Sequence, residues 1–245
     1  MKDSLGGKFK RLERLSETHV GPNGYLIVRL DGKAFHTFTR GCVKPFDGAL
    51  TTAFDHAVYG MCRESDIPIK FAYTQSDEVS LLIDNRDIEP WFGGKIQKIV
   101  SVTASTLTAH FNAYYDKRKP KPAIFDSRVF QLFEDEDVHD YFLWRKKDAN
   151  RNAVSMLAQS LYSHKSLQGI GTHDLVEKIR VDHPESLPIA SRFYNGAHFY
   201  SEVIDMPVEF VDKRTQQIET TMAKRRVWHR DTEDMLDNLA ETLVR

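Results

Sequence analysis

Two aspartates, Asp31 and Asp77, lie beside strand-like stretches where their carboxylates could share a metal ion. Asp31 and Gly32 follow the apolar run at 25–30, and Asp77 lies in the short connection 75–78 between two further apolar runs. Two carboxylates in one site repel each other unless a cation joins them, and Mg²⁺ binds carboxylate, carbonyl and phosphate oxygens. An Asp-Gly pair after a strand is by itself common turn chemistry. Paired metal ions held by carboxylates serve phosphoryl and nucleotidyl transfer. Whether this sequence forms such a site depends on whether the two aspartates lie close together in the fold.

The apolar pattern predicts the elements that would bring these aspartates together. In chain order they are a strand at 25–30, a helix at 47–64, strands at 69–73 and 79–83, a helix at 92–114 and a strand at 124–132. This β-α-β-β-α-β order is typical of an α+β, ferredoxin-like fold. Its first and third strands are neighbours in an antiparallel sheet, so Asp31 and Asp77 should face each other at one end of that sheet.

The second half of the chain has a different pattern. We expect a mostly helical segment at 137–180, a strand-like pair at 198–204 and 208–211, a charged helix at 214–226 and a closing helix. The sequence thus predicts a catalytic domain over 1–135. A mostly helical extension over 136–245 should pack on it, so that the two form one structural unit.

Composition places the chain among ordinary globular proteins. It has 245 residues, of which 41% are hydrophobic and 28% charged. Its net charge of −1 excludes a protein that binds nucleic acid through a strongly basic surface overall. Its two cysteines, Cys42 and Cys62, are expected to be reduced thiols. No secretory apolar segment begins the sequence, and no apolar run approaches the roughly 18 residues of a membrane span. We expect a cytoplasmic protein without membrane contact.

Five ordered blocks of sequence resemble the tRNA-histidine guanylyltransferase family. They are RLDGKAFH at 29–36, KPFD at 44–47, YTQSDEVS at 73–80, FDSR at 125–128 and YFLWR at 141–145. The resemblance covers roughly residues 8–180 and implies a catalytic domain similar to the palm of polymerases. It also implies that nucleotides are added to tRNA 5′ ends in the 3′-to-5′ direction, after activation of the end by ATP or GTP.

The same resemblance implies roles for individual residues. Two Mg²⁺ ions would be held by Asp31, the carbonyl of Gly32 and Asp77. The nucleotide would be contacted by Asp31, Gly32, Lys33, Ala34, Phe35, His36, Lys44, Asp47, Ser76 and Asp77. Glu78 is a further catalytic candidate, either as a third carboxylate facing the metal or as a turn residue. His36 could instead be a structural histidine, and Lys44 a solvated lysine.

One departure from the family pattern indicates the branch. The guanine-adding eukaryotic members carry His-Ile-Asn-Asn where this chain has Asn150-Arg151-Asn152-Ala153. Ala153 has no side-chain donor or acceptor, so base pairing with a template would have to select the nucleotide. This favours the guanylyltransferase-like branch, which repairs truncated tRNA 5′ ends. The resemblance also implies a homotetramer, and the residues predicted to contact RNA are Arg128, Arg145, Lys146 and Asn152.

Three alternatives remain open at the level of sequence. The enzyme could add a fixed guanine to histidine tRNA, or it could be a nucleotide cyclase, because cyclases share this sheet and metal pair. The third hypothesis is that the chain is an RNA-binding module of the same topology. Such modules stack bases on exposed aromatic residues of the central strands, and the strand at 79–83 has none.

Overall fold

A six-stranded antiparallel sheet forms the centre of the protein. The computed structural model describes residues 4–86, 88–115, 121–233 and 235–244. The strands are β1 (Tyr25–Gly32), β2 (Ile69–Gln75), β3 (Glu78–Asp84), β4 (Phe125–Leu132), β5 (Ala197–Val211) and β6 (Ile218–Asp231). Their order in the sheet is β4-β1-β3-β2-β5-β6, and every neighbouring pair is antiparallel. The first four strands have the predicted ferredoxin-like order, which makes β1 and β3 neighbours.

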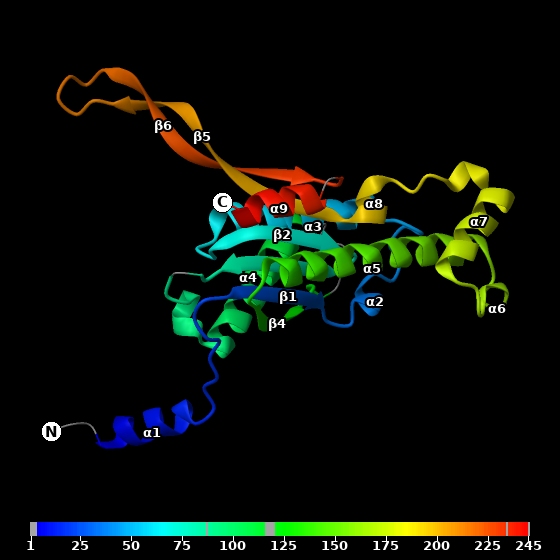
Figure 1. Cartoon of the computed structure of the whole chain (residues 1–245), viewed down its shortest axis with the longest axis horizontal. Coiled ribbons are helices and arrows are strands. Elements are labelled where there is room, and N and C mark those ends of the chain that lie inside the picture. The colour runs from blue at the N-terminus through cyan, green and yellow to red at the C-terminus, as the bar shows by residue number, and fades with distance from the viewer. Residues whose placement is uncertain (1–3, 87, 116–120, 234, 245) are drawn as a thin grey trace.

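Helices cover both faces of this sheet (Figure 1). The described helices are α1 (Ser4–Arg14), α2 (Phe35–Phe38), α3 (Gly48–Glu64), α4 (Ile96–Tyr114), α5 (Asp135–Leu161), α6 (His164–Leu167), α7 (Thr172–Asp182), α8 (Ser191–Asn195) and α9 (Met235–Val244). Short 3₁₀ turns lie at Trp91–Gly94 and Pro184–Ser186. The predicted helix at 92–114 therefore begins only at Ile96, because Phe92 and Gly93 adopt left-handed backbone angles.

Successive residues of β1 point alternately into two hydrophobic cores, one on each face of the sheet, as the two-residue period of a strand requires. Leu26, Val28 and Leu30 are buried in the core that α3 and α4 cover. Tyr25 and Ile27 are buried on the opposite face, with residues of α5 and α9. Because Arg29 and Asp31 continue this second alternation, the face beneath α5 changes from apolar to charged toward the end of the strand.

A long hairpin corrects the sequence prediction for the C-terminal part. The strand pair expected at 198–204 and 208–211 is one strand, β5, and the helix expected at 214–226 is wrong, because these residues belong to the turn and to β6. β5 and β6 pair along their length, and Asp212 closes the turn by accepting hydrogen bonds from the amides of Arg214 and Thr215. Charged residues permitted a helix here, but nonlocal strand pairing decided the structure.

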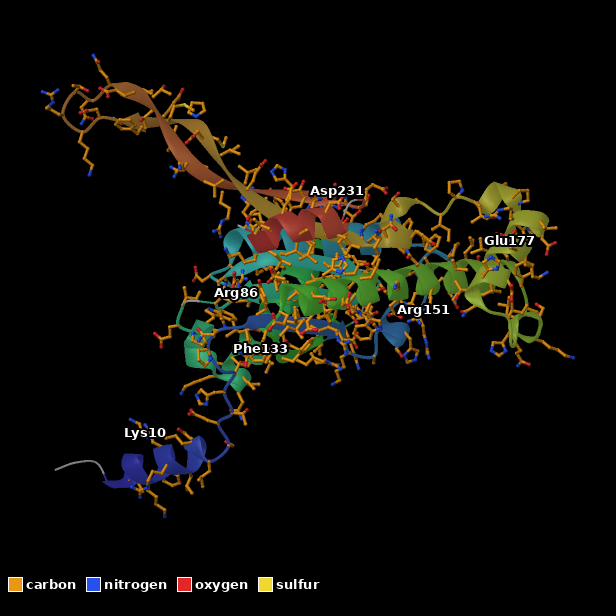
Figure 2. The ribbon with its side chains drawn as sticks, viewed as in Figure 1. Lys10, Arg86, Phe133, Arg151, Glu177 and Asp231 are labelled. Carbon is orange, nitrogen blue, oxygen red and sulfur yellow. The ribbon has the colours of Figure 1, made fainter. Side chains whose placement is uncertain are left out.

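Two segments project from the body of the protein. Figures 1 and 2 show the far half of the β5–β6 hairpin and the helix α1, with Lys10, extending away from the sheet.

Cys42 and Cys62 are free thiols, as predicted. In the described residues, no helix combines the length and apolar character needed to cross a membrane.

Candidate active site

Asp31 and Asp77 come together at one edge of the sheet. Asp31 lies opposite Glu78 in the register of β1 and β3, and Asp77 lies in the tight turn that precedes Glu78. Burial raises the pKa of Asp77 above its ordinary value, and the nearby charge of Asp31 raises it further. The predicted meeting of the two carboxylates is therefore confirmed, whereas their role as metal ligands stays a prediction.

Gly32 is required by the packing of the loop that follows β1. A Cβ atom at this position would lie 2.2 Å from Cδ2 of Phe35, whose ring is buried among other aromatic rings. The amide of Lys33 donates to the carbonyl of Ile124 at 2.8 Å, and Ala34 takes a left-handed conformation with φ of 52°. The loop is thus fixed by one buried ring and one backbone bond, and it turns His36 toward a neighbouring cavity.

This cavity, which we call the α5 pocket, has a volume of about 390 Å³. Its walls come from α2, the loop before α3, the start of α3, the turn after β2, α5 and α8. They include Phe35, His36, Thr39, Cys42, Val43, Lys44, Pro45, Phe46, Asp47, Leu50, Thr51, Gln75, Ser76, Asp77, Ala149, Asn152, Ala153, Met156, Arg192 and Phe193. The rings of Phe46 and Phe193 stack with centroids 4.5 Å apart. The volume and the apolar walls suit a nucleobase, and Asp77 lies at the same pocket.

The predicted nucleotide contacts differ in what their side chains do. Lys44 and His36 are exposed at the α5 pocket, where their nitrogens can donate to phosphate oxygens. The carboxylate of Asp47 instead caps α3, accepting hydrogen bonds from the amides of Leu50 and Val43, each at 3.0 Å. Burial opposes these bonds, yet they lower the pKa of Asp47 below its ordinary value. Asp47 therefore positions the start of α3 at the pocket wall.

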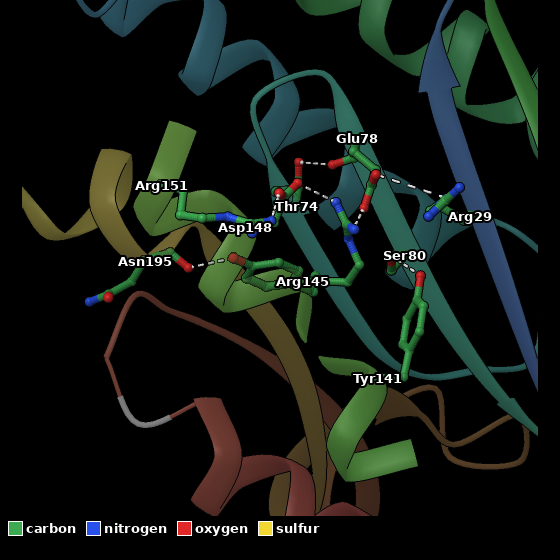
Figure 3. Close-up of polar contacts among 10 residues, drawn as sticks. Arg29, Thr74, Glu78, Ser80, Tyr141, Arg145, Asp148, Arg151 and Asn195 are labelled. Carbon is green, nitrogen blue, oxygen red and sulfur yellow. Dashed lines mark hydrogen bonds and ion pairs between the residues drawn. The ribbon is translucent and has the colours of Figure 1, made fainter. Parts of the chain in front are cut away.

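Glu78 points away from the pocket and into a buried network of charges (Figure 3). Its carboxylate lies 2.7 Å from Nε of Arg145 and 3.9 Å from Nε of Arg29. Burial raises the pKa of Glu78, and the two arginines oppose that shift. Arg145, predicted to contact RNA, is only 4% exposed, so its guanidinium faces Glu78 and Asp148 and not the surface.

Comparison with known proteins identifies the family. A family model described as Thg1, tRNAHis guanylyltransferase, matches residues 6–133, which is more than half of the chain. The chain belongs to this family of nucleotidyltransferases. A bacterial Thg1-like protein solved in complex with ATP is 32% identical, with 98% of this chain and 97% of that one covered and a TM-score of 0.78. The corresponding complex with GTP is 31% identical, with a TM-score of 0.76.

The curated guanylyltransferases match a shorter region than the bacterial Thg1-like protein does. A probable tRNA(His) guanylyltransferase of Dictyostelium discoideum is 33% identical over 138 residues, which are 53% of this chain and 52% of that protein. This chain thus spans about half the length of that relative. An uncharacterized protein of Acanthamoeba polyphaga mimivirus is 24% identical over 205 residues, covering 72% of this chain and 70% of that protein.

The residues of this Thg1-family site suit Mg²⁺. Asp31 and Asp77 offer carboxylate oxygens, and Gly32 offers a carbonyl, which are the hard oxygen donors that Mg²⁺ prefers. In the parts of the chain that the structure describes, no group of three or more His, Cys, Asp or Glu side chains gathers as a metal site. Water and substrate phosphates would have to supply the other ligands, as is usual for Mg²⁺ in sites that act on nucleotides.

Sequence reasoning missed part of the α5 pocket. Arg192 and Phe193 come from the short helix α8, far along the chain from the other walls. No local sequence pattern predicted that these two residues line the pocket. Of the predicted RNA contacts, Arg128 is exposed on β4, where it pairs with Asp126 at 3.5 Å. Lys146 is half-buried on α5, and Asn152 lines the pocket itself. RNA binding by these three residues stays a prediction.

Proposed function

We propose that this protein adds nucleotides to tRNA 5′ ends in the 3′-to-5′ direction, with two Mg²⁺ ions and a template. The observation that carries the proposal is the meeting of Asp31 and Asp77 at one edge of the sheet, where Asp77 also lines a pocket of nucleobase size. An RNA-binding module needs no such carboxylate pair, and two neighbouring carboxylates repel each other unless a cation joins them.

The residues of the site divide the chemistry among them. Asp31, Asp77 and the carbonyl of Gly32 would hold Mg²⁺, which when bound neutralises triphosphate charge and makes a hydroxyl a better nucleophile. Lys44 and His36 would donate to phosphate oxygens and so orient the reacting phosphorus. The base of the nucleotide would lie between the apolar walls of the α5 pocket. The first step would then join a nucleoside monophosphate to the 5′-phosphate of the tRNA and release pyrophosphate. In the second step, the 3′-hydroxyl of an incoming nucleotide would displace that nucleoside monophosphate.

The α5 side of the pocket supports selection of the nucleotide by a template. Asn150 donates to the carbonyl of Tyr194 at 2.6 Å, and Ala153 is buried without polar side-chain atoms. Asn152 is therefore the polar side chain that this four-residue stretch contributes to the pocket. One amide offers few contacts for recognising guanine alone. The match to a bacterial Thg1-like protein, which covers 98% of this chain and 97% of that one, supports the same branch.

Labelled 5′-truncated tRNAs test this proposal directly. Each tRNA should carry one of the four bases opposite the missing position and be incubated with Mg²⁺ and all four nucleotides. We expect the Watson–Crick partner to be added in each case, and Asp31→Ala and Asp77→Ala to remove nearly all addition while circular dichroism shows an intact fold. Guanine added whatever base stands opposite would refute the template, and a cyclic product from ATP alone would favour the cyclase.

We also propose that the protein works as a homotetramer, with tRNA spanning the subunits. Exposed apolar residues on the projecting hairpin support an assembly surface, since Val203, Phe210, Ile218 and Met222 are 43–71% exposed. Light scattering at micromolar concentration should give the mass of a tetramer. An active monomer under the same conditions would contradict this part of the proposal.

A further inference from the structure

An arginine is buried between α5 and the sheet, close to the two aspartates. Arg145 follows Tyr141 and Phe142 by one turn of α5, so it lies on the helix face that packs on the sheet. A buried charge is costly unless it is paired, and Arg145 has two partners. Its Nε lies 2.7 Å from Glu78 Oε1, and its Nη2 lies 2.7 Å from Asp148 Oδ2.

The first of these partners stands at the turn that carries Asp77. Glu78 is the first residue of β3 and directly follows Asp77, so anchoring its side chain also anchors one end of the turn. Glu78 also lies 3.9 Å from Arg29, which precedes Asp31 by two residues on β1 and faces the same side of the sheet. The network therefore contacts β1, which carries Asp31, and β3, which begins directly after Asp77.

The turn itself holds an unfavourable backbone conformation. Ser76 has a φ of 49°, in the left-handed region that non-glycine residues rarely adopt. Within the turn, the hydroxyl of Thr74 donates to the carbonyl of Glu78 at 3.0 Å, and that of Ser76 donates to Asp77 at 3.1 Å. Strained conformations persist where the surroundings fix them, and Arg145 contacts Glu78, at the end of this turn, from the side of α5.

The surroundings of Arg145 separate it from the surface. The indole ring of Trp144 lies 4.2 Å from its guanidinium carbon, and Asp148 is also held by Arg151, a more exposed residue, at 2.6 Å. Figure 3 shows the guanidinium of Arg145 directed toward Glu78 at the sheet. A phosphate could reach Arg145 only if these contacts opened.

We propose that Arg145 is a positioning residue, which through Glu78 holds the turn of Asp77 in the place where Asp77 meets Asp31. The inference rests on the proposed function, because it assigns Arg145 to the metal site of that reaction. It replaces the RNA contact that the sequence predicted at this position. Partners that orient metal ligands commonly change metal affinity by about 10- to 100-fold when they are removed.

Binding of Mn²⁺ tests the inference without measuring activity. Mn²⁺ would be titrated into the full-length protein with a non-hydrolysable ATP analogue, and the free ion followed by electron paramagnetic resonance. Arg145→Met should weaken Mn²⁺ binding by about 10-fold or more. Tyr141→Phe is the matched control, because it removes a buried hydrogen bond to Ser80 one turn away on the same face of α5 and should leave Mn²⁺ binding unchanged.

A double variant separates positioning from stability. Arg145→Met leaves Glu78 buried without its closest partner and should lower the melting temperature, whereas Arg145→Met with Glu78→Gln removes that charge and should recover stability. Mn²⁺ binding by the double variant should nevertheless stay about 10-fold weaker than in the wild type.

Two outcomes would overturn the inference. A folded double variant with wild-type Mn²⁺ affinity would leave Arg145 without a positioning role, and so would a loss confined to tRNA affinity. If the wild-type protein with the ATP analogue binds no Mn²⁺, both the proposed function and this inference fail.

Discussion

Replacing Gly32 by alanine should disturb stability and activity together. The new Cβ would lie 2.2 Å from Cδ2 and 2.6 Å from Cγ of Phe35, which is roughly 1 Å short of an ordinary carbon–carbon contact. The ring of Phe35 is 5% exposed and packs against Phe54, Phe111 and Phe125, so it has little room to move. The backbone at Asp31 and Gly32 must therefore shift instead.

The size of both effects follows from this geometry. Overpacking of a core typically costs about 1–3 kcal/mol, and each kcal/mol corresponds to roughly 2–4 °C in the melting temperature of a chain of this size. A displacement near 1 Å at a reacting centre can cost about 100-fold in rate. We therefore expect a lower melting temperature by calorimetry and about 100-fold slower nucleotide addition at saturating Mg²⁺.

Two further variants make the prediction specific. Gly48→Ala is the control, because its Cβ would have no neighbour within 4 Å at the start of α3, and it should change stability by less than about 0.5 kcal/mol. Gly32→Ala combined with Phe35→Leu should regain part of the lost activity, since the smaller side chain relieves the clash. A Gly32→Ala enzyme with wild-type melting temperature and rate would refute the argument.

Three other predictions concern pH, the pocket and the start of α3. Because the pKa of Asp77 is raised by burial and by Asp31, nucleotide addition should fall as the pH drops through that raised value, and tenfold more Mg²⁺ should move this acidic limb to lower pH. If the acidic limb of the pH profile does not move with the Mg²⁺ concentration, the assignment of Asp77 as a Mg²⁺ ligand is contradicted. Ala153→Leu should fill the α5 pocket and raise the KM for the nucleotide about 10-fold, whereas Gln159→Leu, at an exposed position of the same helix, should not. Asp47→Ala should cost about 1 kcal/mol in urea unfolding at neutral pH. Since the folded pKa of Asp47 is lowered, its contribution to stability is present above the unfolded pKa of about 3.9 and is lost as the pH falls through the lowered value. Unfolding midpoints of wild type and variant that stay equally far apart at low pH would contradict this account.

The palm part of the fold was predictable because its signals are local. Alternating and three-to-four-residue apolar patterns marked the strands and helices between residues 25 and 132, and their order alone placed Asp31 and Asp77 at one edge. The hairpin was not predictable in this way. Residues 214–226 carry a charge-rich pattern compatible with a helix, and only their pairing with β5 makes most of them a strand.

The site was predictable only on the side formed by contiguous motifs. Phe193 reaches the α5 pocket from a helix of five residues, and its stacking on Phe46 depends on the path of the whole chain. Arg145 lies in the basic cluster 145–147 and in the block YFLWR at 141–145, and these two features predicted an RNA contact. Its spacing from Tyr141 and Phe142 was the signal that it faces the sheet.

The hairpin of β5 and β6 also divides the protein into regions of unequal local stability. Among the residues that the structure describes, no helix and no third strand covers its outer half, whereas β1 and β3 are covered on both faces. Amide hydrogens near Val208 and Thr221 should therefore exchange with deuterium through local opening, while those of Val28 and Leu81 should exchange only when the whole domain unfolds. A tRNA or second subunit that covers the hairpin would slow exchange there first, so exchange rates along β5 and β6 would report where such a partner binds.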